Sequence, residues 1–188
     1  TRFQPKTQQV EPILMASRDG RHFQRWNEAL IPISAPKDRD GNRSNYMTWG
    51  LVQLAGDERH LSVYAKEAYY AGPGSRLRRF TFRVDGFVSV HAGNPGGQFT
   101  TRPVTFTGDS LSINAATLEG GKLTVELLDA AGKPYPGFSA ADCQAFAGDS
   151  LDHRVQWKSA AKLGSLVGQP VRIRFQLLNA DLFSLRFS

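Results

Sequence analysis

The chain has 188 residues, of which 40% are hydrophobic and 21% charged, so it is long and apolar enough to bury a core, unlike disordered or collagen-like chains. No stretch approaches the roughly 18 consecutive apolar residues that span a bilayer. The net charge is +6: residues 1–85 hold 14 basic and 9 acidic side chains, and residues 86–188 hold 9 and 8. Because the basic residues form no clusters with spaced aromatic residues, we expect neither nucleic acid nor a membrane as partner.

Strand patterns and turns alternate through residues 1–85. Ile13–Gly20 runs into an Asp-Gly turn and His22–Trp26 returns from it, which predicts a hairpin. A polar loop follows at 34–45. Three further strands are then expected at 47–54, 61–66 and 77–84, separated by turns that contain glycine. Successive hairpins predict a β-meander of the kind found in a propeller blade.

The second half, 86–188, shows the two-residue period of half-buried strands. In Lys122–Leu128 the apolar side chains are Leu123, Val125 and Leu127, and Val171–Leu177 repeats the alternation. A last strand is expected at 182–187. Short strands separated by Gly, Pro, Asn and Asp predict a β-sandwich of the jelly-roll type. The sequence therefore predicts an all-β protein with two parts, 1–85 and 86–188.

Several of these segments carry a family resemblance. Ser17–Gly20, Leu61–Glu67 and Arg78–Val90 resemble the last blade of bacterial proteins related to five-bladed-propeller glycoside hydrolases, such as invertases, levanases and arabinanases. Thr101–Phe106 and Arg174–Ser184 resemble the β-sandwich appended to such propellers. The resemblance implies the C-terminal part of a longer carbohydrate-active protein. Its partners would be an oligo- or polysaccharide and the missing blades or another protein surface.

The chain also departs from that family. Invertase-like enzymes carry their catalytic carboxylates in Asn-Asp-Pro and Arg-Asp-Pro motifs, and neither motif occurs here. Arg18 and Asp19 are followed by Gly20, which predicts a turn. A chain of 188 residues is also too short for five blades and a sandwich. We therefore expect a non-catalytic portion, inactive alone. The first residue is Thr1, so removal of an upstream segment is an open alternative, and a secreted or periplasmic location is favoured.

Glu67 is the best candidate for a catalytic group. Glycoside hydrolysis uses two carboxylates on opposite sides of the bond. Glu67 ends an apolar strand and is followed by Tyr69 and Tyr70, whose rings are able to stack on sugar faces. In a blade without its neighbours, we expect the site around Glu67 to be open and wet. The alternative is that Glu67 is a solvated residue at a strand end.

A saccharide platform is expected around the same residues. Aromatic rings cover the apolar face of a pyranose, and planar donors bind its hydroxyl groups. The candidate binding residues are Arg43, Tyr46, Trp49, Tyr69 and Tyr70. Trp49 lies in a strand pattern, so a place in the core is its alternative.

No cofactor is expected. Cys143 is the only cysteine, which excludes an intramolecular disulfide and a cysteine-based zinc site. Asp109, Asp129 and Asp149 lie in turns, so turn formation is the first interpretation of each, with a structural calcium ion left open. Two other functions remain: a stand-alone carbohydrate-binding module, and a structural or interaction domain.

Overall fold

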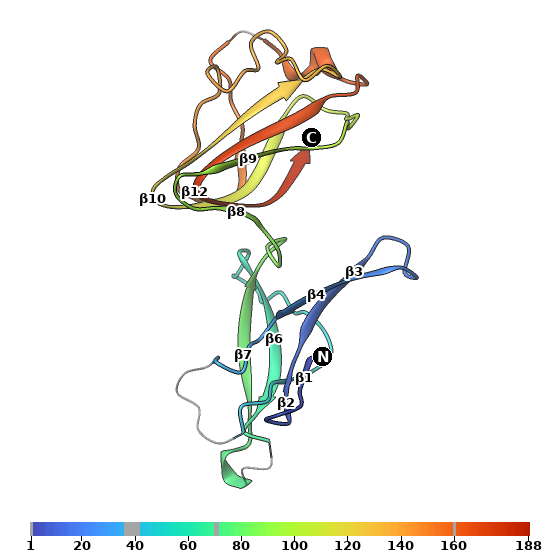
Figure 1. The fold of residues 1–188 in the computed structure, drawn as a ribbon, viewed down its shortest axis with the longest axis vertical. Helices are drawn as coiled ribbons and strands as arrows, with labels where there is room; N and C mark the ends of the chain where they lie inside the picture. Colours follow the sequence, from blue (N-terminus) through green and yellow to red (C-terminus); the bar gives the residue numbers. More distant parts are fainter. Residues whose placement is uncertain (1, 36–41, 70–71, 160) are drawn as a thin grey trace. The chain divides into compact units, whose positions relative to one another are not determined.

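The structure, a computed structural model, describes residues 2–35, 42–69, 72–159 and 161–188. Within these residues the regular structure is almost entirely β, with two short 3-10 helices, η1 (Gly72–Gly74) and η2 (Leu163–Leu166). The predicted all-β fold class is therefore confirmed. The chain divides into two compact units, Thr1–Val84 and Asp85–Ser188 (Figure 1). The interpretation of the first unit as a propeller blade stays a prediction.

The N-terminal unit contains three small antiparallel sheets. Their strands are β1 (Arg2–Gln4) with β2 (Gln9–Glu11), β3 (Ile13–Ser17) with β4 (Phe23–Ala29), and β6 (His60–Glu67) between β5 (Tyr46–Met47) and β7 (Arg76–Arg83). The hairpin predicted around the Asp-Gly turn is present as β3 and β4. The strand predicted at 47–54 is reduced to β5 and an isolated bridge between Val52 and Ser62.

This unit has a small apolar core. Ile31, Val63 and Ala65 are buried, and Phe80 and Phe82 pack against them while remaining partly exposed. Several polar side chains are buried in the same unit: Glu11, Ser44, Asn45, Ser62 and Glu67. Because buried polar groups destabilise a fold unless they are hydrogen-bonded or paired, the stability of this unit depends on polar contacts as well as on apolar packing.

The C-terminal unit is built on one five-stranded sheet. Its long central strands, β10 (Leu111–Leu128) and β12 (Arg172–Phe187), pair with each other in antiparallel fashion. β11 (Asp149–Arg154) pairs with β10, while β8 (Val90–Ala92) and β9 (Gly97–Thr100) both pair with β12. β8 pairs with residues 180–182 of β12 and β9 with residues 174–177, so the two short strands lie beside different halves of one long strand.

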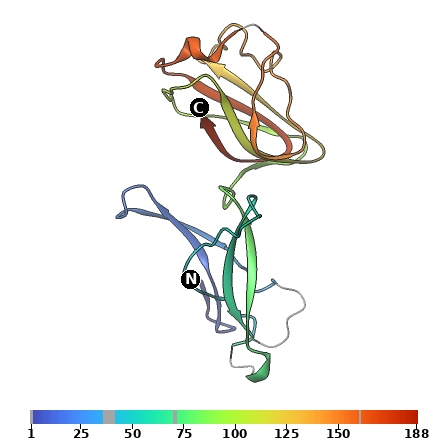
Figure 2. The same cartoon turned by 180° about the vertical axis from the view of Figure 1, so that it is seen from behind.

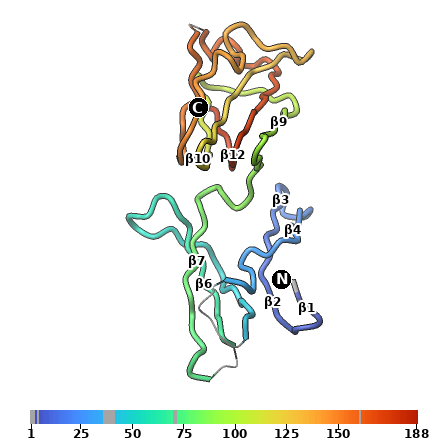
Figure 3. The backbone as a smooth tube through the Cα atoms, turned by 60° about the vertical axis from the view of Figure 1, so that its left-hand side comes forward, coloured from blue at the N-terminus to red at the C-terminus, as the bar shows by residue number. Residues whose placement is uncertain are grey.

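The sheet curls because both long strands bend at the same place. The pairing of β10 with β12 shifts register between Thr117 and Lys122, opposite the left-handed residue Asn179 (φ 44°). Register irregularities of this kind bend a strand and increase its twist. Figure 2 shows the curled sheet, and in Figure 3 β12 turns sharply partway along its length. The result is one continuous sheet curled into a half-barrel. The sequence pattern predicts a β-sandwich of the jelly-roll type, and the structure builds this all-β unit on the single curled sheet.

The core of this unit lies on the inner face of the curled sheet. Leu123, Val125, Leu127, Ile173 and Phe175 are each at most 1% exposed. The paired register places Leu123, Val125 and Leu127 opposite Leu177, Phe175 and Ile173. The apolar alternation predicted for both strands is confirmed.

Two adjacent glycines at the bend differ sharply in their surroundings. A Cβ atom on Gly121 would overlap the carbonyl oxygen of Asn179 and lie 2.8 Å from that of Leu118, whereas none of the described residues has an atom within 4 Å of a Cβ on Gly120 (φ +69°). We expect Gly121→Ala to lower the free energy of unfolding by about 3 kcal/mol, because backbone atoms must move. Gly120→Ala should lower it by only about 1 kcal/mol, the strain of a left-handed alanine. Urea unfolding measures both, and equal effects would contradict the assigned bend.

Candidate functional site

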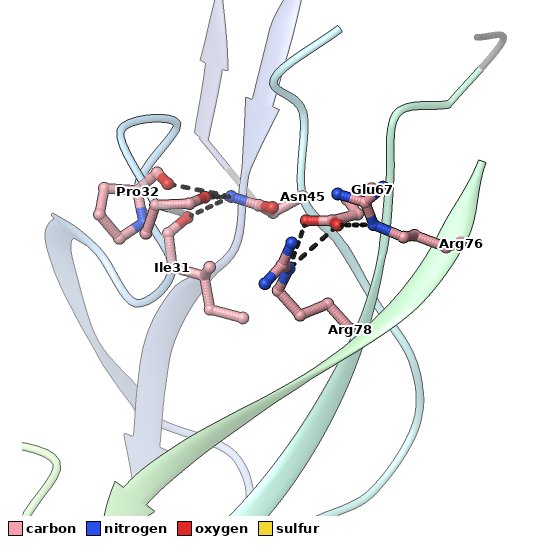
Figure 4. A network of polar contacts seen from close by, with 7 residues as sticks. Ile31, Pro32, Asn45, Glu67, Arg76 and Arg78 are labelled. Carbon is pink, nitrogen blue, oxygen red and sulfur yellow. Dashed lines mark hydrogen bonds and ion pairs between the residues drawn. The ribbon is translucent and has the colours of Figure 1, made fainter. Parts of the chain in front are cut away.

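The structure places Glu67 in the interior of the N-terminal unit. Its side chain is 0% exposed. Arg76 Nε donates to Oε1 at 2.5 Å, and Arg78 Nε lies 3.0 Å from Oε1 and 2.9 Å from Oε2 (Figure 4). The expectation of an open, wet site around Glu67 is therefore wrong, and so is its alternative as a solvated strand-end residue.

The burial of Glu67 follows from strand alternation. Successive side chains of β6 point to opposite faces of the sheet, so Lys66 is exposed while Glu67 and Ala65 are buried. The cross-strand partner of Glu67 is Arg76, two residues before Arg78 on the same face of β7. Both guanidinium groups thus reach the carboxylate from one neighbouring strand. The geometry gives Glu67 a structural ion-pair network.

Arg43 also has an internal contact. Its Nε donates to the backbone carbonyl oxygen of Ile33 at 2.5 Å. The nearby Asn45 is buried, and its Nδ2 donates to the carbonyl oxygens of Ile31 (3.3 Å) and Pro32 (3.0 Å) (Figure 4). These side chains hydrogen-bond to the backbone of the segment around residues 31–33. Arg43 therefore serves the local fold and does not line the hollow described next.

Tyr46 and Tyr69 do come together, as predicted for a platform of aromatic rings. Their ring centroids are 5.0 Å apart with an interplanar angle of 60°, an edge-to-face arrangement. The Nζ of Lys66 lies 4.7 Å from the centroid of the Tyr69 ring. The two rings border a hollow of about 440 Å³, whose lining residues are Thr7, Gln8, Gln9, Asn42, Tyr46 and Tyr69. We call this the tyrosine hollow.

Backbone contacts between distant segments assemble the tyrosine hollow. The N–H of Val10 donates to Ser44 Oγ (3.0 Å), and the N–H of Asn45 donates to the carbonyl oxygen of Val10 (2.9 Å). Tyr46 then pairs with Lys66 across β5 and β6, close to Tyr69. Three segments far apart in sequence, 7–9, 42–46 and 66–69, therefore meet at one place.

The remaining predicted aromatic residues lie elsewhere. The side chain of Trp49 is 101% exposed, so its alternative place in the core is excluded, but it does not line the tyrosine hollow. Tyr70 lies outside the described residues.

Sequence reasoning missed the polar half of the hollow. Thr7, Gln8, Gln9 and Asn42 lie in short polar stretches without strand periodicity. Gln8 has a positive φ of 55° at the turn between β1 and β2, and Asn42 Oδ1 accepts a hydrogen bond from the N–H of Ser44 (2.8 Å). A cluster of Thr, Gln and Asn is the only signal in the sequence, and it does not distinguish a site from a turn.

A second hollow in this unit, of about 630 Å³, surrounds the β3–β4 turn. Its carboxylate, Asp19, accepts hydrogen bonds from the N–H groups of Arg21 (2.9 Å) and His22 (2.8 Å), and Asp19 Oδ2 lies 2.6 Å from His22 Nδ1. The side-chain hydrogen bond with His22 holds the pKa of Asp19 far below its ordinary value. This carboxylate stabilises the turn, in agreement with the predicted role of Arg18, Asp19 and Gly20.

Comparison with known proteins identifies no relative: no family model matches the chain, and no curated protein or solved structure does. In the described part of the chain, no three His, Cys, Asp or Glu side chains gather to hold a metal ion. Among the same residues we find no helix with the length and hydropathy needed to cross a bilayer.

Proposed function

We propose that this chain binds an oligo- or polysaccharide in the tyrosine hollow and does not hydrolyse it. The observation that carries the proposal is the meeting of two tyrosine rings with Thr, Gln and Asn side chains around one hollow. If the family resemblance holds, the chain is a saccharide-binding, non-catalytic portion of a glycoside-hydrolase-like protein. A stand-alone carbohydrate-binding module would use the same hollow.

The chemistry of the lining supports a saccharide ligand. A pyranose ring has apolar C–H faces, which pack on aromatic rings, and equatorial hydroxyl groups, which need donors and acceptors. Each carboxamide of Gln8, Gln9 and Asn42 contains both an N–H₂ donor and a carbonyl acceptor. Tyr46 keeps 36% of its surface exposed, so its ring is accessible to a ligand. Pockets that combine aromatic walls with a few polar groups are typical of small-ligand sites.

The prediction for binding concerns Tyr69. We expect Tyr69→Ala to weaken saccharide binding about thirtyfold, since removal of an aromatic anchor typically costs about 2 kcal/mol or more. Isothermal titration calorimetry with fructan, arabinan and xylan oligosaccharides measures this change. Phe23→Ala is the matched control, because Phe23 is 56% exposed in the same unit but does not line the hollow. Equal losses in both variants, or no binding by the unmodified chain, would contradict the proposal.

We also predict no hydrolysis. The described lining of the tyrosine hollow contains no Asp or Glu, and Glu67 is buried between Arg76 and Arg78. Hydrolysis requires two carboxylates at a defined separation across the substrate. Incubation with fructans, arabinans, xylans and aryl glycosides should release no reducing sugar. If the chain hydrolyses one of these substrates and Glu67→Gln abolishes the hydrolysis, Glu67 belongs to an active site and the prediction is wrong.

A second candidate function is docking against another protein surface. The segment that includes β5 and runs along β6 exposes Met47 (42%), Trp49 (101%), Leu51 (50%) and Val52 (46%). Exposed apolar side chains that lie close together are common on surfaces where another protein binds. If Trp49→Ala abolishes saccharide binding and Tyr69→Ala leaves it unchanged, the saccharide binds at this exposed segment and not in the tyrosine hollow. Absence of all saccharide binding would favour the docking function.

A further inference from the structure

The C-terminal unit contains a separate hollow of about 690 Å³ next to Trp157. Its floor is apolar and its rim polar. The floor residues are Leu111, Phe138, Val155, Trp157 and Leu163, and the rim includes Asp109, Gln144, Arg154, Gln156 and Lys162. We call it the Trp157 hollow. Its described lining residues all belong to the C-terminal unit, and none of them lines the tyrosine hollow.

The indole of Trp157 is held in one orientation. Its Nε1 donates to the carbonyl oxygen of Val125 at 3.1 Å, and its ring meets Phe138 edge-to-face with centroids 5.1 Å apart and an interplanar angle of 76°. The backbone of Trp157 forms a β-bridge with Cys143. Trp157 is only partly buried, although it packs against the core. A fixed, accessible aromatic ring is therefore part of the hollow before any ligand arrives, which limits the entropy lost on binding.

Two carboxamides lie together on the rim. The bridge between Cys143 and Trp157 places Gln144 opposite Gln156, and the N–H of Gln144 donates to the carbonyl oxygen of Gln156 at 2.8 Å. Both side chains are exposed. Within the part of the chain that the structure describes, neither carboxamide has a hydrogen-bond partner of its own. Each therefore offers a free donor and a free acceptor at the hollow.

A loose ion pair completes the rim. Arg154 Nη2 and Asp109 Oδ1 are 3.6 Å apart, and the two side chains are 62% and 83% exposed. Charge-assisted hydrogen bonds are shorter, about 2.7–2.9 Å. Each partner therefore retains hydrogen-bonding capacity for a hydroxyl group, while the pair as a whole is close to neutral.

We propose that the Trp157 hollow is a second ligand site, which binds a neutral sugar unit with its ring against the indole. Paired carboxamides and an Arg–Asp pair provide both donors and acceptors, which fits vicinal hydroxyl groups. Lys162 adds one positive charge to the rim, which disfavours an ammonium group and supplies a further donor to a hydroxyl oxygen. The site stands on its own geometry and does not require binding at the tyrosine hollow. Together, the two hollows would let one chain contact a polysaccharide at two places.

The test uses the emission of Trp157 in the full chain. The protein has three tryptophans, so Trp26→Phe with Trp49→Phe leaves Trp157 as the only one. The probes are cellotetraose, xylotetraose, maltotetraose and inulin-type fructan tetrasaccharide. We expect at least one probe to change the emission in a saturable way. Adding Gln156→Ala or Arg154→Ala should weaken that response about five- to tenfold, the loss of one direct hydrogen bond.

Gln98→Ala is the matched control, because Gln98 is an exposed glutamine of the same unit that does not line this hollow. It should leave the response unchanged. Calorimetry on the unmodified chain, with and without Gln156→Ala, gives a second measurement should the double tryptophan variant fold poorly. The proposal is overturned if no probe binds once Tyr69 is replaced, or if neither Gln156→Ala nor Arg154→Ala weakens binding.

Discussion

Replacing Arg76 and Arg78 together by alanine is expected to lower the free energy of unfolding of the N-terminal unit by about 3–5 kcal/mol. Both guanidinium groups contact the carboxylate of Glu67, which is 0% exposed. Their removal leaves a buried negative charge without these two cations. Arg76 itself is 50% exposed, so solvent screens part of its interaction, and we expect the lower half of the range.

The lost free energy of unfolding is measured by hydrogen exchange at the amides of β6 and β7, followed by NMR. Arg79→Ala is the matched control: it removes an exposed arginine from the same strand, and the expected change is within about 0.5 kcal/mol. Adding Glu67→Met to the double variant should recover much of the stability, because the buried charge is then gone. A double variant as stable as Arg79→Ala would refute the ion-pair network.

The second large effect is expected for Phe175→Ala, which should destabilise the C-terminal unit by about 3–5 kcal/mol. Phe175 is 0% exposed on the inner face of β12, stacked on Phe99 of β9 with centroids 5.1 Å apart, and opposite Val125 of β10. Truncation removes a large apolar contact area and leaves a cavity among three strands that are fixed by their hydrogen bonds.

Urea unfolding monitored at the amides of β10 and β12 measures this change. Leu118→Ala is the control, because Leu118 lies in the same sheet with 66% of its surface exposed. Its expected effect is within about 0.5 kcal/mol. If Phe175→Ala were no more destabilising than Leu118→Ala, the inner face of the curled sheet would not be the core.

The candidate site was predictable only in its aromatic half. Tyr46 and Tyr69 are recognisable as candidate residues because aromatic side chains near a strand end suggest a stacking surface. Thr7, Gln8 and Gln9 were not recognisable, because they reach the hollow through a hydrogen bond between Val10 and Ser44, residues 34 positions apart. The local sequence pattern carries no information on a hydrogen bond between residues so far apart in the chain.

Glu67 shows that local sequence also does not reveal whether a strand residue is buried. Its predicted position at the end of a strand is confirmed, since β6 ends at Glu67. Which face of the sheet is covered depends on what packs against it, and a period of two is compatible with either face. Arg76 and Arg78 of β7 allow Glu67 to be buried, because their guanidinium groups neutralise its carboxylate within the interior.

What the sequence by itself determined is the all-β class, the hairpin at the Asp-Gly turn and the apolar face of the strands around Leu123, Val125 and Ile173. These features follow from side-chain periodicity and turn chemistry, which are local. Only the tertiary structure decided that Gly120 and Gly121 bend one continuous strand instead of separating two. Backbone pairing of β10 with β12 on both sides of the bend keeps that strand intact, and such pairing between residues 44 to 76 positions apart is invisible to any local pattern.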